Sequence, residues 1–176
     1  MMLSQVVEMA LRHVLQRKIS EPSLSMQDEG FEFRFVTFQD LKSSLVRIFG
    51  SPARAIVYDA GIEPGRRSFD RMVNETKSKE EVLKLLVSRK AGQNWGMISV
   101  ESLDWQTNSG RISIQDCFEA RGRKETQLSV EPSCDFFKGY LAGFLSALFR
   151  SDVKVIEERC MAMGDALCVF AFRPTP

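Results

Sequence analysis

Three cysteines and a glutamate near the end of the chain have the side chains and the spacing of a metal site. They are Cys134, Glu157, Cys160 and Cys168. Three thiolates and a carboxylate can supply the four tetrahedral ligands that Zn²⁺ prefers. A zinc ion with four protein ligands has no open position for water, which is typical of a structural site rather than a catalytic one. Few other residues in the sequence suggest chemistry, so most functional inference depends on this group.

Two of these cysteines are expected to face each other across a hairpin. Cys160 and Cys168 are equidistant from Gly164, and directly opposed residues of paired strands have Cβ atoms roughly 4.5–5.5 Å apart. That separation suits two sulfurs on one zinc, and it is also near the range of a disulfide. Cys134 lies at the start of an expected helix, where the helix N-terminus favours a thiolate.

The identity of the carboxylate ligand is ambiguous from spacing. Glu157 lies three residues before Cys160, an odd step that turns it to the other face of an ideal strand. Either a bulge brings Glu157 round, or Glu158 is the ligand, and ideal geometry alone favours Glu158. The competing explanation for all the thiols is core packing, because cysteine is often a small buried hydrophobe. Core packing is the expected role of the fourth cysteine, Cys117.

The helices that must position this group have recognisable start and stop signals. Ser4 precedes an amphipathic series over 6–15, and Thr37 begins a helix that Gly50 ends. Further helices are expected from Pro52 onward, with interruption or kinking at Gly61, Pro64 and Gly65, and from the capping box of Ser78 and Glu81 to Gly92.

Strand patterns dominate the second half of the chain. Residues 97–103 and 111–120 alternate apolar and polar side chains around a turn, and 153–162 and 166–173 flank a second turn. One strongly apolar helix, 134–150, separates the two hairpins, and 31–35 is a further candidate strand. The order predicts a single α+β domain over 1–176, with an antiparallel sheet packed against helices.

Composition excludes several functional classes. The 24 basic and 23 acidic residues give a net charge of +1 with no basic run, so we expect no direct contact with nucleic acid. The longest apolar run, 136–149, is too short for a membrane span and contains Lys138. The first residues lack the pattern of a signal peptide. We therefore expect a cytoplasmic protein, in which cysteines are thiols or metal ligands rather than disulfides.

The second half also carries a family pattern, strongest over 131–172. It consists of Cys134, Gly139-Tyr140-Leu141-Ala142-Gly143, Val155, Glu157, Cys160, Gly164-Asp165 and Cys168. This pattern closely resembles the 4-vinyl-reductase-type, or hydrocarbon-binding, domain family, and the segment ARAIVYDAGIEPGRR resembles the family's first-half helix. The same domain is the sensor module of NtrC-type activators that respond to aromatic hydrocarbons.

The resemblance carries expectations of its own. In those sensors, the residues that match Cys134, Glu157, Cys160 and Cys168 bind a structural zinc, so the resemblance favours Glu157 over Glu158. It also implies a fold related to the subunits of the TRAPP vesicle-tethering complex, and a homodimer. A helix face of small residues, including Gly139 and Gly143, could serve that interface or packing within the chain. The aromatic sensors hold a phenol-type ligand with a His and a Trp that have no identifiable counterparts here; the only histidine is His13.

The expected function is non-catalytic binding or sensing of an apolar or aromatic small molecule. The sequence contains no dinucleotide-binding or P-loop motif, and a single histidine makes a Ser-His-Asp or Cys-His arrangement implausible. The alternatives are an accessory or carrier protein in tetrapyrrole metabolism and a protein-interaction module. Family members keep a cavity between the helix 134–150 and the sheet, which predicts a ligand pocket lined by Ile112, Ile114, Phe118, Phe137, Tyr140, Leu141 and Phe144.

Overall fold

The protein is described by a computed structural model that covers residues 34–124 and 131–176. These residues belong to one unit, Phe33–Pro176. The expected helix over 6–15 and His13 lie outside the described residues. Within the described ranges, no helix is long and apolar enough to cross a membrane.

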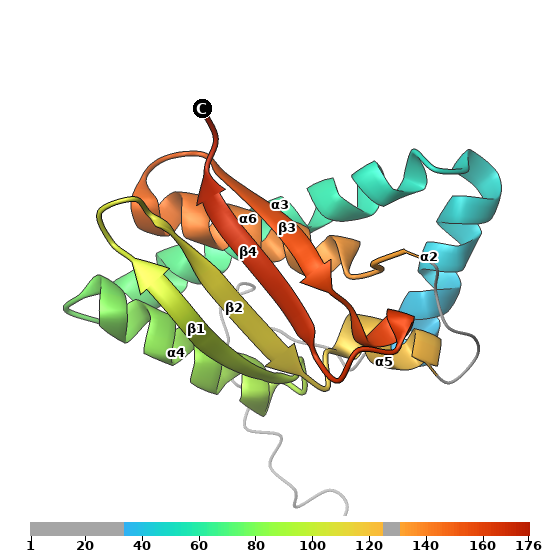
Figure 1. The fold of residues 1–176 in the computed structure, drawn as a ribbon, viewed down its shortest axis with the longest axis horizontal. Coiled ribbons are helices and arrows are strands. Elements are labelled where there is room, and N and C mark those ends of the chain that lie inside the picture. The colour runs from blue at the N-terminus through green and yellow to red at the C-terminus, as the bar shows by residue number, and fades with distance from the viewer. Residues whose placement is uncertain (1–33, 125–130) are drawn as a thin grey trace, which may run out of the picture. The chain divides into compact units, whose positions relative to one another are not determined.

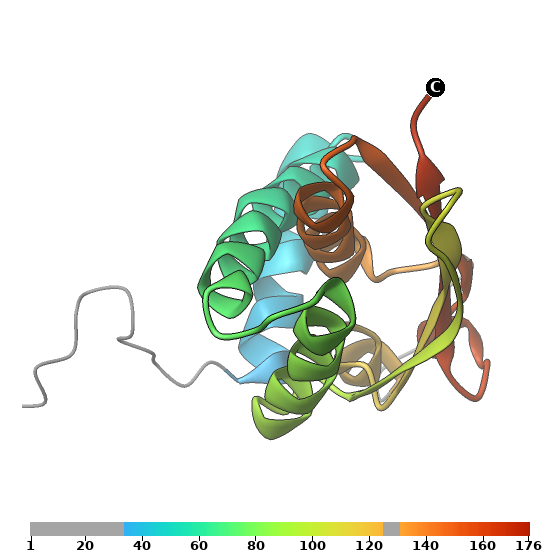
Figure 2. The same cartoon turned by 90° about the vertical axis from the view of Figure 1, so that its left-hand side faces the viewer.

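Four antiparallel strands form one sheet in the order β1-β2-β4-β3 (Figure 1). The strands are β1 (Met97–Asp104), β2 (Ser109–Gln115), β3 (Val153–Arg159) and β4 (Cys168–Pro174). The helices are α2 (Phe35–Phe49), α3 (Ala53–Val73), α4 (Lys79–Gly92), α5 (Phe118–Lys124) and α6 (Asp135–Phe149). Figure 2 shows the helices on one side of the sheet, with α6 between the sheet and α3. The predicted α+β fold with an antiparallel sheet is confirmed.

Helix ends follow the local signals in two places. Gly50 ends α2 in the left-handed region, with φ 66°, a conformation that glycine adopts without steric cost. Ser78 caps α4, because its side chain accepts a hydrogen bond from the Glu81 N–H at 3.2 Å. The strand expected at 31–35 is wrong where the structure describes it, since Arg34 is the N-cap of α2 and Phe35 is its first residue.

The interruption expected at Gly61, Pro64 and Gly65 is also wrong, because α3 runs through all three. These glycines allow α3 to lie directly against α6. A Cβ on Gly61 would stand 2.2 Å from the carbonyl oxygen of Phe136 on α6. A Cβ on Gly139 of α6 would stand 1.9 Å from the carbonyl oxygen of Tyr58 on α3. Equivalent close approaches occur at Gly65 and Gly143. The glycines on the small-residue face of α6 are therefore used within the chain.

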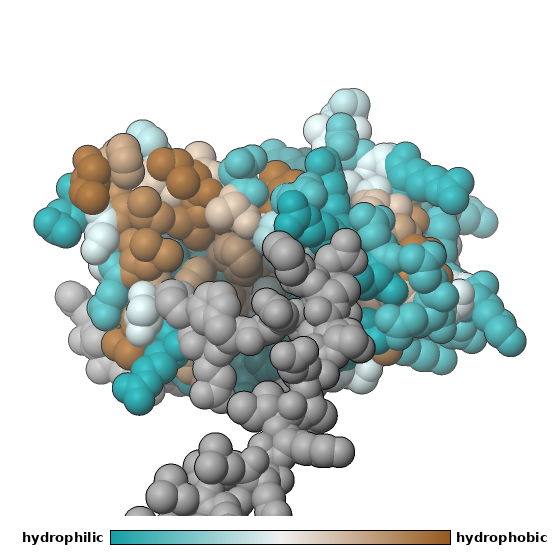
Figure 3. Space-filling view, turned by 180° about the vertical axis from the view of Figure 1, so that it is seen from behind, coloured by the Kyte–Doolittle hydropathy of each residue, from teal (hydrophilic) through white to brown (hydrophobic). Residues whose placement is uncertain are grey.

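One corner of this unit exposes apolar side chains where α2 meets α3. Figure 3 shows apolar residues gathered on this face, and those exposed on the two helices here are Val46, Ile48, Phe49 and Ile56. The interior lies instead between α6 and the sheet, where Phe137, Leu141 and Phe170 are fully buried.

Candidate metal centre

Cys134, Glu157, Cys160 and Cys168 converge on one buried point. One potential ligand atom from each lies within 4.8 Å of those of the others. Cys134 is the N-cap of α6, Glu157 lies on β3, Cys160 follows the end of β3, and Cys168 begins β4. The cluster therefore lies where the start of α6 meets the β3–β4 hairpin.

A bulge in β3 determines which glutamate faces this cluster. Glu157 pairs with Phe170, whereas Arg159 pairs with Val169, so Glu158 is an extra residue in the ladder. Because of this extra residue, the inward-facing positions include both Glu157 and Cys160. Glu158 is displaced to the surface, where it forms an ion pair with Arg111 at 3.0 Å. The structure thus places Glu157 at the cluster and Glu158 outside it.

The sulfur separations suit a tetrahedral ion. Cys134 Sγ lies 3.9 Å from Cys160 Sγ and 3.7 Å from Cys168 Sγ. Sulfurs at two corners of a tetrahedron with Zn–S bonds of roughly 2.3 Å lie about 3.8 Å apart. A disulfide has its sulfurs roughly 2.05 Å apart, and all four cysteines of the chain are free thiols. The arrangement matches a metal site better than a cross-link.

The Glu157 carboxylate has one satisfied and one unsatisfied oxygen. Oε2 accepts a hydrogen bond from the Cys134 N–H at 3.0 Å. Oε1 is buried and has no hydrogen-bond partner among the described residues. Burial, reinforced by the neighbouring Cys160, raises the pKa of Glu157 to about 9. A buried oxygen without a partner costs roughly 1–3 kcal/mol, and a cation beside Oε1 would remove this cost. The residues present fit a bound metal ion.

The turn after β3 orients two of the thiols through backbone hydrogen bonds. The Met161 N–H donates to Cys168 Sγ at 3.4 Å, and the Cys160 N–H donates to the Asp165 carboxylate at 2.8 Å. Gly164 has φ 102°, a conformation that side chains rarely tolerate. Such outer-shell contacts hold metal ligands in position.

A buried ion pair supports the start of α6. The Glu119 carboxylate accepts hydrogen bonds from the N–H groups of Phe136 at 3.1 Å and Phe137 at 2.8 Å. Lys42 Nζ lies 2.5 Å from both Glu119 Oε1 and the Ser133 carbonyl oxygen. Burial raises the pKa of Glu119 to about 6, although Lys42 opposes the shift. Sequence reasoning missed this pair, since it placed Glu119 in a strand and a cap so distant in sequence has no local signal.

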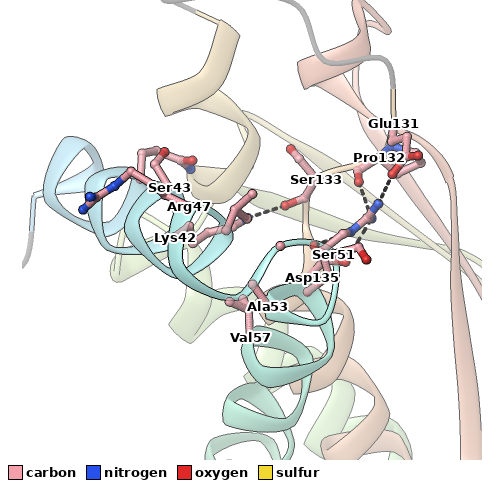
Figure 4. A pocket seen from close by; sticks show the side chains of 14 residues that line it. Lys42, Ser43, Arg47, Ser51, Ala53, Val57, Glu131, Pro132, Ser133 and Asp135 are labelled. Carbon is pink, nitrogen blue, oxygen red and sulfur yellow. Dashed lines mark hydrogen bonds and ion pairs between the residues drawn. The ribbon is translucent and has the colours of Figure 1, made fainter.

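A second polar contact fastens the segment just before α6 to α3. Arg54 makes a bidentate ion pair with Asp135, at 3.0 and 3.1 Å, and donates to the Pro132 carbonyl oxygen at 2.6 Å. It also pairs with Glu131. Figure 4 shows these contacts around a hollow of about 510 Å³. We call it the α2–α3 hollow; residues of α2, α3 and 131–135 line it. Its Lys42 and Arg54 already have carboxylate partners, so the hollow offers little unpaired charge.

The residues predicted to line a ligand pocket are all buried in the core. They are Ile112, Ile114, Phe118, Phe137, Tyr140, Leu141 and Phe144. None of them lines the α2–α3 hollow. One placement is corrected, because β2 ends at Gln115 and Phe118 belongs to α5 rather than to the strand. The ligand pocket itself stays a prediction.

Within this core, two polar groups are incompletely satisfied. The Tyr140 hydroxyl is buried and has no hydrogen-bond partner among the described residues, and burial raises its pKa. Lys90 Nζ lies 3.8 Å from the ring centroid of Trp95 and 4.7 Å from that of Tyr140, and it donates to Gln93 at 2.8 Å. Burial lowers the pKa of Lys90 to about 8. Sequence reasoning gave Trp95 and Lys90 no role, since neither lies in a pattern that marks a site.

Comparison with known proteins connects this geometry to a family. An uncharacterised protein of Methanocaldococcus jannaschii is 26% identical over 121 residues, which cover 69% of this chain and 65% of the relative, slightly less than two thirds of its length. The phenol-responsive sensory domain of the transcription activator PoxR, solved with phenol, is similar in structure, with a TM-score of 0.75 and 19% identity over 82% of this chain and 76% of that one.

Two other solved structures share the fold. A vinyl-4-reductase family protein from Methanocaldococcus jannaschii has a TM-score of 0.57 and 19% identity, covering 85% of this chain and 87% of that one. A trafficking protein particle complex subunit 3 from Naegleria fowleri, covalently bound to palmitic acid, has a TM-score of 0.61 and 13% identity over 81% and 93% of the two chains. Residues 111–174 match the family model of the vinyl-4-reductase domain, which confirms for this part of the chain the resemblance to the 4-vinyl-reductase-type family.

Proposed function

We propose that this chain is a non-catalytic domain that binds an apolar or aromatic small molecule and uses a structural zinc to join α6 to the β3–β4 hairpin. The zinc ligands would be Cys134, Cys160 and Cys168 through Sγ and Glu157 through Oε1. The observation that carries the metal proposal is the unpartnered Glu157 Oε1 beside three thiols at tetrahedral spacing. Bound zinc would supply a cross-link between segments that are distant in sequence.

The small-molecule part of the proposal draws support from fold and core together. The PoxR domain that shares this fold is described as phenol-responsive, and the residues predicted to line the pocket surround Tyr140. The unpartnered Tyr140 hydroxyl is the polar contact that a ligand lodged between α6 and the sheet would satisfy. Lys90 lies on the same ring and could face an anionic or phenolic oxygen.

Binding can be tested with the protein as purified. Native mass spectrometry should detect a co-purified apolar molecule, and phenol or a fluorescent apolar probe should bind with measurable affinity. Tyr140→Phe should weaken a probe that carries a hydroxyl and leave a hydroxyl-free analogue unaffected. The predicted pocket also requires that Ile114→Trp block uptake without changing zinc content. Failure of every probe to bind would contradict the proposed function.

The α2–α3 hollow is the competing location for the ligand. Val46 lines this hollow and is 44% exposed, so Val46→Trp fills it with little disturbance of the core. If Val46→Trp abolishes binding and both Tyr140→Phe and Ile114→Trp leave it unchanged, the ligand lies in the hollow. The opposite pattern places it between α6 and the sheet.

Two other functions stay as alternatives. Similarity to a vinyl-4-reductase family protein favours an accessory or carrier role in tetrapyrrole metabolism, which predicts a porphyrin-like absorption in the co-purified ligand. Similarity to a trafficking complex subunit favours a protein-interaction module, which predicts that no small molecule binds.

We also propose a cytoplasmic homodimer that makes no direct contact with nucleic acid. The exposed apolar residues where α2 meets α3 provide a surface for the second copy. Light scattering at tens of micromolar protein, where contacts worth about 7 kcal/mol already associate, should give twice the chain mass of 20.0 kDa. A monomer would contradict the dimer without affecting the zinc proposal.

A further inference from the structure

Cys117 lies at the edge of the cluster rather than in a strand. The pattern of residues 111–120 predicted a strand in which Cys117 only packs in the core. Instead β2 ends at Gln115, and Asp116 adopts a positive φ of 55°. This reversal of direction delivers Cys117 to the start of α6, where its side chain is fully buried.

The Cys117 thiol stands as close to the cluster as the expected ligands do. Its Sγ lies 3.7 Å from Cys134 Sγ, the same distance as that from Cys134 Sγ to Cys168 Sγ. Cys134 therefore has three sulfur neighbours at 3.7–3.9 Å, which matches the edge of roughly 3.8 Å in a tetrahedral zinc–sulfur site. Together with Glu157, five donor side chains surround a position that needs four.

The extra donor differs from Glu157 in chemistry. A carboxylate oxygen is a hard ligand, whereas a thiolate is soft and favours thiophilic ions. Glu157 Oε2 is already occupied by the Cys134 N–H, so this carboxylate can keep a structural role after leaving the metal. A Cys117 thiol that coordinates would release one proton.

We propose that Cys117 is a reserve metal ligand. It replaces Glu157 when the bound ion is thiophilic, which converts a three-sulfur, one-oxygen site into a four-sulfur site. The inference rests on the proposed metal site and extends its ligand class from zinc to soft divalent ions such as Cd²⁺. Zinc itself binds through Glu157, and Cys117 then stays a neutral neighbour of the Cys134 thiolate.

Cadmium loading of the full chain tests this directly, because the ultraviolet sulfur-to-metal absorption grows with the number of Cd–S bonds. In Cys117→Ser, absorption per bound Cd²⁺ should fall to about three quarters of the wild-type value, the ratio of three thiolates to four. Zinc content should stay at one per chain in the same variant, which shows that it is folded. Equal cadmium absorption in the two proteins would overturn the proposal.

Glu157→Gln provides a second, independent comparison. If Cys117 takes the fourth position, this variant should bind Cd²⁺ with wild-type affinity and absorption. Adding Cys117→Ser to it should then weaken Cd²⁺ by at least about 100-fold, the upper end of the cost of losing even an outer-shell partner. A Glu157→Gln variant that loses Cd²⁺ as fully as the double variant would show that Cys117 never coordinates. Wild-type protein that binds neither ion would instead reject the metal site as a whole.

Discussion

The close contact between α3 and α6 predicts a large penalty for one added methyl group. Gly139 lies on α6 about one turn after Cys134, and its added Cβ would stand 1.9 Å from the Tyr58 carbonyl oxygen. Carbon and oxygen atoms in close contact normally remain roughly 3.3 Å apart. Because the obstacle is helix backbone, no side-chain rotation can relieve the clash, and Gly139→Ala must push the helices apart by more than about 1 Å.

Two opposing effects set the size of the change. Alanine in place of glycine stabilises a helix by about 1 kcal/mol. Overpacking of a rigid contact costs typically about 1–3 kcal/mol and sometimes more, and here the displaced helix also begins at Cys134. We expect the clash to win, with a net loss of about 3 kcal/mol of unfolding free energy. In a chain of this size, that loss lowers the melting temperature by roughly 6–12 °C.

Urea and thermal unfolding followed by circular dichroism measure the effect. Gly92→Ala is the matched control, because a Cβ there meets nothing within 4 Å, and it should stabilise by about 0.5 kcal/mol. Gly139→Ala should also weaken zinc, since the displaced helix carries one ligand. A Gly139→Ala protein within about 0.5 kcal/mol of wild type would refute the proposed backbone contact.

Three further substitutions test the polar groups around the site. Lys90→Met should stabilise the protein by about 2 kcal/mol at pH 7: a pKa lowered from 10.5 to about 8 costs about 3.4 kcal/mol at 1.36 per unit, less about 1–2 for the ring contacts. Since the native state binds fewer protons than the unfolded state between those values, wild-type stability should rise from pH 8 to 10.5, and the variant should lack this rise in urea titrations. Cys168→Ser should lose zinc in elemental analysis while Glu158→Gln keeps it; equal content in both would contradict the ligand assignment. Arg54→Met should cost about 2 kcal/mol in urea unfolding because its carboxylate partner on α6 is buried, whereas the exposed pair removed by Arg67→Met should cost less than about 0.5.

The sequence predicted what local patterns determine. Gly50 and the Ser78 cap marked helix ends correctly, and the cysteine spacing identified residues that do converge. Both hairpins pair as the alternation indicated. These signals succeed because each depends on residues a few positions apart.

Register and long-range contacts were beyond such patterns. One extra residue in β3 decides between Glu157 and Glu158, and alternation cannot locate a bulge. Pro64 is a local helix breaker, yet α3 continues through it because the helix packs along α6. The turn at Asp116 removed Cys117 from the predicted strand, since aspartate tolerates the left-handed conformation without requiring it.

Zinc content is the most direct test of the proposed metal centre. Protein purified under reducing conditions with zinc present, then dialysed, should contain one zinc per chain by elemental analysis. X-ray absorption at the zinc edge should show three sulfur neighbours and one oxygen, with Zn–S distances of about 2.3 Å. Chelation should lower the melting temperature, because the metal's binding free energy contributes to folding. Protein without zinc after such loading, or with a Cys160–Cys168 disulfide under reducing conditions, would contradict the proposal.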